Sequence, residues 1–159
     1  MNVHTSTIQS LSTALQSQSI TPPELVDAHI QRIETINPIV NGMIADRFEA
    51  AREEARAASI EILKGPNESK PLLGIPCTIK EFIGVKGMPQ TGGLLWRKEV
   101  TAETDATVVQ RLRNAGAIIM GSSNIPEGGL WMETYNSIYG RTLNPWNVKR
   151  TPGGSSGGE

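Results

Sequence analysis

The sequence predicts an α/β layered protein in which N-terminal helices form an outer layer. Two observations carry this prediction. Residues up to about 65 show helical hydrophobic patterns, and an apolar run at 72–79 is followed by a capped helix and a second buried strand. Strand, helix and strand in this order favour at least one parallel pair. We expect a helical outer layer over about 5–65 and an α/β part from about 71, within one domain.

Three helices are expected in the N-terminal part. The first places apolar residues on one face, namely Ile8, Leu11 and Leu15. The second begins at Thr21, which forms a capping box with Glu24, and ends at Asn37-Pro38 because proline disfavours a continuing helix. The third, over about 46–63, is rich in Ala, Glu and Arg at helical spacing and stops at a Gly-Pro pair.

The α/β part has its own sequence of signals. A helix is expected from Thr104 or Asp105 to Gly116, with three residues on its buried side: Val108, Val109 and Leu112. Residues 117–120 form a compact strand, and 121–127 a loop that leaves it. The final segment, 151–159, is so rich in glycine that we expect a helix to follow it, and we interpret the chain as truncated there.

The composition argues against several classes of protein. Hydrophobic residues make up 38% and charged residues 19% of the 159 residues, and the net charge of −1 argues against a nucleic-acid partner. No apolar run could span a bilayer and residues 1–10 lack a signal-peptide pattern, so a cytoplasmic location is expected.

The single cysteine, Cys77, excludes an internal disulfide and is expected to be a small buried hydrophobe. The two histidines, His4 and His29, leave a Ser-His-Asp mechanism few candidates, and His29 is expected on a helix surface.

Lys80 is the first candidate for chemistry. It follows directly from the apolar run 72–79, where partial desolvation disfavours the charged ammonium form and can make a lysine a general base. The alternative is a strand-end lysine that reaches solvent or pairs with Glu81. Local sequence leaves both interpretations open.

The loop 153–158, Gly-Gly-Ser-Ser-Gly-Gly, allows three interpretations. Its backbone N–H groups could hold a phosphate, although neither the lysine of a Walker loop nor a G-x-G-x-x-G pattern is present. It could be a flexible linker. It could instead present a serine hydroxyl in tight backbone surroundings, as the loops of serine nucleophiles do. The residues alone do not decide among the three.

Four motifs, in order, resemble the amidase-signature family. They are similar to the family's lysine motif, its G-x-[ST]-N-x-x-E loop, its N-P-W turn and the opening of its glycine- and serine-rich signature, at residues 74–81, 121–127, 144–146 and 151–159. The separation of Lys80 from Ser155 also agrees with the family's layout. Cys77 departs from it, since the family often has an aliphatic residue there. The amino-acid sequence of the final loop looks closest to that of fatty-acid amide hydrolases.

The resemblance implies a partial amidase-signature fold, with N-terminal helices packed on part of a mixed β-sheet in α/β/α layers. It also implies a Ser-Ser-Lys triad. Lys80 would be the unprotonated base, and Ser155 the bridging serine, held by a cis peptide bond. Further residues would support this loop: Gly153, Gly154, Ser156, Gly157 and Gly158. The attacking serine and the oxyanion hole would follow beyond this sequence. The 159 residues would then be the N-terminal part of a single amidase-signature domain, inactive alone. No cofactor or metal is implied.

The resemblance also implies an activity, the hydrolysis of a linear carboxylic amide such as a fatty-acid amide. The partner would be a small-molecule amide substrate, and a homodimer is allowed for the full-length form. A substrate-facing wall would be formed by Gly128, Gly129, Leu130 and Trp131, with ordinary core contacts for the last two as the alternative. A glutamyl-tRNA(Gln) amidotransferase A-type subunit is a second candidate, disfavoured by the absence of a basic surface. A non-catalytic truncated product or binding fragment is a third.

Overall fold

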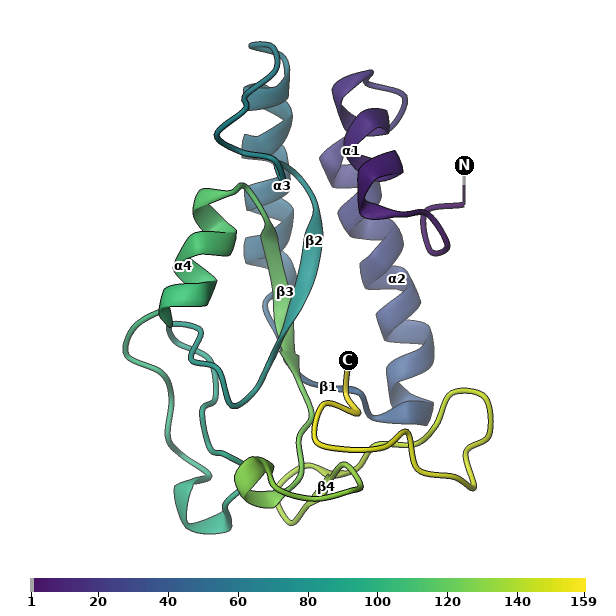
Figure 1. Cartoon of the computed structure of the whole chain (residues 1–159), viewed down its shortest axis with the longest axis vertical. Helices are drawn as coiled ribbons and strands as arrows, with labels where there is room; N and C mark the ends of the chain where they lie inside the picture. Colours follow the sequence, from purple (N-terminus) through teal and green to yellow (C-terminus); the bar gives the residue numbers. More distant parts are fainter. Residues whose placement is uncertain (1) are drawn as a thin grey trace. The chain divides into compact units, whose positions relative to one another are not determined.

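The computed structural model describes residues 2–159 and confirms the predicted mixture of helices and a small sheet. The described residues form these elements, most of them labelled in Figure 1, in the order α1 Ile8–Gln16, α2 Pro22–Val40, β1 Met43–Asp46, α3 Phe48–Ile62, β2 Pro76–Lys80, η1 Leu95–Arg97, α4 Thr107–Asn114, β3 Ile118–Ser123, η2 Glu127–Gly129, β4 Tyr135–Asn136 and β5 Gly140–Arg141. Among the described residues, no helix is both long and apolar enough to cross a membrane.

Two compact units make up the chain. The first unit comprises Met1–Arg32, Arg47–Cys77 and Gln110–Met120, and the second unit comprises Ile33–Asp46, Thr78–Val109 and Gly121–Glu159. All the candidate residues for chemistry except Cys77 and the two histidines belong to the second unit.

The first unit contains an apolar cluster formed by side chains of its helices and of the segments beside them. The buried members are Leu11, Leu15, Leu25 and Ile75, with Val3, Ile20, Ile62 and Leu72 packed against them. Small residues on α3 also lie buried: Ala51, Ala55 and Ala58. Of the three apolar residues expected on one face of the first helix, Leu11 and Leu15 are buried, whereas Ile8, at the start of α1, is 59% exposed.

The capping box at the start of α2 is confirmed. The Thr21 N–H donates to the Glu24 carboxylate at 2.8 Å, and the Glu24 N–H donates to Thr21 Oγ1 at 3.4 Å. The predicted end of this helix was wrong, because α2 continues through Pro38 to Val40. Beyond the proline, the Asn41 N–H still reaches the Asn37 carbonyl at 2.8 Å, and the Asn37 side chain pairs with both backbone groups of Met43. These hydrogen bonds stabilise the end of α2 and offset the loss of the helical hydrogen bond that the N–H of a residue other than proline would donate.

The main sheet has the strand order β1-β3-β2. At the start of β3, the Ile118 N–H donates to the carbonyl oxygen of Ile75, the residue before β2, at 2.9 Å. At the end of β3, Ser123 O accepts from the N–H of Glu81, the residue after β2, at 3.1 Å. Because both bonds follow the chain in the same sense, β2 and β3 form the predicted parallel pair. β1 pairs antiparallel with β3 and was not predicted. The sequence pattern predicts that the following helix begins at about residue 46, but Asp46 is the last residue of β1 and the helix α3 begins at Phe48.

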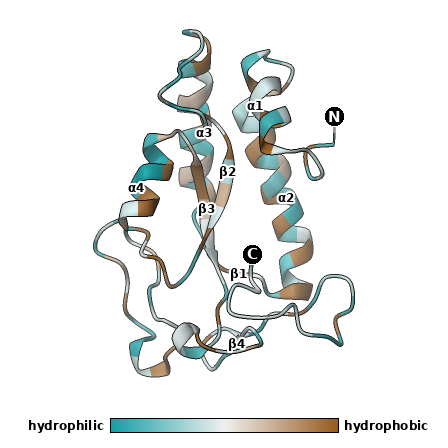
Figure 2. Ribbon diagram, viewed as in Figure 1, coloured by the Kyte–Doolittle hydropathy of each residue, from teal (hydrophilic) through white to brown (hydrophobic). Residues whose placement is uncertain are grey.

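β3 extends further than predicted. The sequence predicts a loop at residues 121–123, but they continue the strand, and all six residues of β3 are buried. Figure 2 shows apolar residues along the first part of this strand. The helix before it, α4, starts at Thr107 and buries Val109, whereas Val108 is 48% exposed, so its predicted burial was wrong.

Candidate functional site

Lys80 is the last residue of β2, and its amine is directed at two serine hydroxyls. Lys80 Nζ donates to Ser155 Oγ at 2.7 Å and to Ser156 Oγ at 3.1 Å. The neighbouring Glu81 does not pair with Lys80, as the alternative interpretation of this lysine allowed. Its carboxylate is fully buried and accepts bonds from Thr91 N–H at 2.5 Å, Thr91 Oγ1 at 2.6 Å and Gly92 N–H at 3.1 Å. Successive side chains of a strand point to opposite faces, which separates the lysine from this carboxylate.

The loop that presents the serines packs closely against the backbone of 131–133. A Cβ at Gly154 would overlap the Trp131 carbonyl oxygen and lie 2.8 Å from the Met132 carbonyl carbon. Only glycine therefore fits at this position. The peptide bond between Gly154 and Ser155 is cis. The structure thus brings Lys80, Ser155 and Ser156 together on a loop that lies against a neighbouring segment.

A buried threonine joins the two ends of this loop. Thr134 Oγ1 donates to the Gly153 carbonyl oxygen at 2.9 Å and accepts the Gly157 N–H at 3.0 Å. Sequence reasoning missed Thr134, which lies in none of the four motifs.

Glu159 ties the end of the signature to two strands. Its carboxylate accepts from Thr78 Oγ1 at 2.7 Å and from Ser123 Oγ at 2.5 Å. Thr78 precedes Lys80 by two residues on the same strand, so the two side chains share one face of β2. Sequence reasoning assigned no role to Glu159, although the motif contained it.

Two asparagines of the motifs form hydrogen bonds in the segments before the signature loop. Buried Asn124 donates to Thr142 Oγ1 at 2.9 Å and accepts from Asn136 Nδ2 at 2.9 Å. Asn144 accepts from the Trp146 N–H at 2.9 Å and donates to Thr151 O at 3.1 Å. The side chain of Asn144 therefore stabilises the N-P-W turn and links it to Thr151, the first residue of the signature.

An open hollow lies beside the bridging-serine candidate. Five residues line its space of about 380 Å³: Gly129, Leu130, Trp131, Met132 and Ser155. Three of the four residues expected at a substrate-facing wall thus line one hollow with Ser155, and Gly128 does not. Leu130 is 87% and Trp131 62% exposed, so neither makes ordinary core contacts within these 159 residues.

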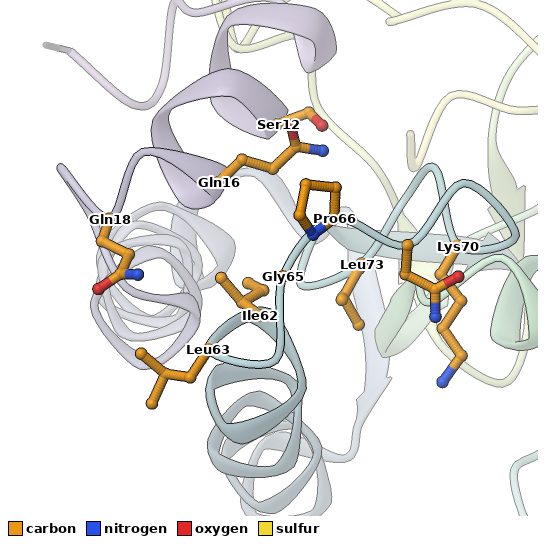
Figure 3. A pocket seen from close by; sticks show the side chains of 10 residues that line it. Ser12, Gln16, Gln18, Ile62, Leu63, Gly65, Pro66, Lys70 and Leu73 are labelled. Carbon is orange, nitrogen blue, oxygen red and sulfur yellow. The ribbon is translucent and has the colours of Figure 1, made fainter.

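A second hollow, of about 140 Å³, lies in the first unit (Figure 3). Side chains from α1, from the end of α3 and from the segment after it line this space, among them Gln16, Ile62 and Lys70. Lys70 is paired with Glu61 at 2.7 Å, and this pairing lowers the pKa of Glu61. None of the lining residues belongs to the four motifs.

A family model described as Amidase matches residues 24–159. The chain belongs to the amidase family. Fatty-acid amide hydrolase 2-B of Danio rerio is 43% identical over 156 residues, which cover 94% of this chain and 30% of the relative. The A-type subunit of the glutamyl-tRNA(Gln) amidotransferase of Nitratidesulfovibrio vulgaris (strain DP4) is 40% identical over 156 residues, which cover 98% of this chain and 31% of the relative.

Solved amidase structures share the fold. A 6-aminohexanoate cyclic dimer hydrolase, complexed with substrate, superposes with a TM-score of 0.87 and 33% identity, covering 99% of this chain and 31% of that one. The chain spans about 30% of the length of the curated relatives described above.

Proposed function

We propose that this amidase chain contributes the base and the bridging serine of an amide-hydrolysing site. The proposal is supported by the 2.7 Å distance between Lys80 Nζ and Ser155 Oγ. A neutral Lys80 would accept the proton of Ser155 while Ser155 accepts one from an attacking hydroxyl. The reverse transfer would protonate the departing amine. Ser156, with its Oγ at 3.1 Å from the same amine, would hold the lysine in line with this relay. We assign the attacking hydroxyl to no residue of this chain.

The proposed substrate is an amide with an apolar acyl group. The hollow beside Ser155 exposes Leu130, Trp131 and Met132, which would lose contact with water when an acyl chain binds. The similarity to the Danio rerio relative, a fatty-acid amide hydrolase, supports the same class of substrate.

The test is amide hydrolysis by the protein expressed from the longest reading frame that contains residues 1–159. We expect Lys80→Met and Ser155→Ala each to lower kcat by about 10²–10⁴, the usual contribution of a positioned acid–base group. Lys98→Met is the control, because Lys98 is 61% exposed and pairs only loosely with Glu99 at 3.8 Å. Circular dichroism should show unchanged folding in all three. Near-normal turnover by either site variant would defeat the proposal.

A second candidate is a glutamine-hydrolysing subunit of an amidotransferase. The 40% identity to the A-type subunit of an amidotransferase favours it. The same assay separates the two, since a fatty amide and glutamine differ in the apolar area that the hollow could bury. Preference for glutamine by the wild-type protein would support the second candidate. Hydrolysis of neither, with the protein folded, would support a non-catalytic binding role.

A further inference from the structure

One hydroxyl group holds both ends of the segment that carries Ser155 and Ser156. Thr134 Oγ1 donates to Gly153 O at 2.9 Å and accepts from Gly157 N–H at 3.0 Å. These backbone groups flank the two serines in the chain. A single side chain therefore fixes the span of the loop between them.

Thr134 is itself held in place. It is fully buried, and its carbonyl oxygen accepts the N–H of Thr142 at 2.9 Å. The Thr142 side chain in turn donates to the Asn41 carbonyl at 2.7 Å. The approach to the loop is close, because a Cβ at Gly157 would overlap Thr134 Oγ1 and lie 2.7 Å from Gly153 O. The threonine hydroxyl thus fills the space between the two loop ends and satisfies a polar group at each.

We infer that Thr134 is a positioning residue that sets the distance between Ser155 and the Lys80 amine. The inference rests on the proposed function, because the distance matters only if these two groups exchange a proton. Thr134 has no hydrogen bond to Lys80, Ser155 or Ser156 among those of the described residues, so it acts through the loop backbone. Valine at this position would keep the shape of the side chain but leave Gly153 O and Gly157 N–H without this partner.

The kinetic test compares Thr134→Val with Thr134→Ser in the protein from the longest reading frame that contains this chain. We expect Thr134→Val to lower kcat for an amide substrate by about 10–100-fold, with KM changed less than about twofold, since misplacement affects the transition state more than binding. Thr134→Ser retains the hydroxyl and should recover most of the activity. Wild-type kcat in Thr134→Val, or equal losses in both variants, would overturn the inference.

Amide hydrogen exchange at Gly157 provides a readout that needs no activity. We expect faster exchange of this N–H in Thr134→Val and a near wild-type rate in Thr134→Ser. An unchanged rate in Thr134→Val overturns the inference whatever the activity. If the wild type and Lys80→Met hydrolyse amides equally well, the proposed function fails instead, and the two failures are thereby distinguished.

Discussion

At the scale of single residues, Gly154 sets how closely the serine loop can approach the segment 131–133. A methyl group there would overlap the Trp131 carbonyl and lie 3.0 Å from Glu133 N. We expect Gly154→Ala to lower the free energy of unfolding by roughly 1–3 kcal/mol, the range for an overpacked site. It should also lower kcat by about 10²-fold, because a displacement of about 1 Å at a reacting group has that effect. Urea denaturation and amide hydrolysis measure the two quantities.

The neighbouring glycine provides the matched control. Gly153 has φ +99°, and a methyl group at this position would have no neighbouring atom within 4 Å, so Gly153→Ala changes only the backbone preference. Its expected cost is roughly 1–2 kcal/mol, with a smaller effect on kcat. If Gly154→Ala is as active as Gly153→Ala, the close approach of the serine loop to segment 131–133 does not affect catalysis.

Residue by residue, the sequence predicted the parts of the site that a motif spells out. The motifs contain Lys80, Ser155 and Ser156, and the structure places them within hydrogen-bonding distance. Thr134 escaped prediction because it bonds to backbone groups 19 and 23 residues away, and any residue could supply those groups. Contacts of this kind leave no local pattern in the sequence.

At the scale of elements, the start of α2 depends on a carboxylate. Thr21 N–H and Thr21 Oγ1 both donate to Glu24, and these bonds lower the pKa of Glu24 below its ordinary value. A lowered folded-state pKa adds stability above the unfolded-state pKa, and this stability is lost as the pH falls through the folded-state value. We expect Glu24→Gln to lower the melting temperature at neutral pH relative to wild type, and the difference to shrink as the pH falls through the pKa of the folded state.

A suitable control lies further along the same helix. Glu34 is exposed, and Glu34→Gln removes the same charge without touching the cap. Melting curves of the three proteins at neutral and acidic pH separate the two effects. A Glu24→Gln deficit that stays constant with pH, or one matched by Glu34→Gln, would rule out the cap as its source.

The elements that were predicted correctly have strong local signals, and those that were missed depend on tertiary partners. The capping box indicated the start of α2, because its two residues bond to each other. β1 has only four residues and is defined by its pairing with β3. Residues 121–123 contain glycine and serine, which suggest a loop, yet they are buried in the central strand of the sheet. Here burial overrides local preference.

At the scale of the whole molecule, the distribution of tryptophan departs from that of an ordinary core. All three tryptophans belong to the second unit and are exposed: Trp96 by 78%, Trp131 by 62% and Trp146 by 96%. Indole fluorescence shifts to shorter wavelengths when the ring leaves water. We therefore expect the emission maximum of the folded 159-residue chain to lie close to that of N-acetyltryptophanamide and to change little in denaturant. A strongly blue-shifted maximum would contradict this exposure.

The sensitivity of indole fluorescence to water makes Trp131 a reporter for the proposed acyl site. In Trp96→Phe/Trp146→Phe, the remaining indole lines the hollow beside Ser155. An amide with an apolar acyl chain should displace water from this ring, shift its emission to the blue and slow quenching by acrylamide. In the matched variant Trp96→Phe/Trp131→Phe, only Trp146 remains, and this residue does not line the hollow. Equal shifts in both variants would mean that the ligand binds the exposed aromatic surface without selecting the hollow. No shift in either would contradict binding of the acyl chain in this hollow.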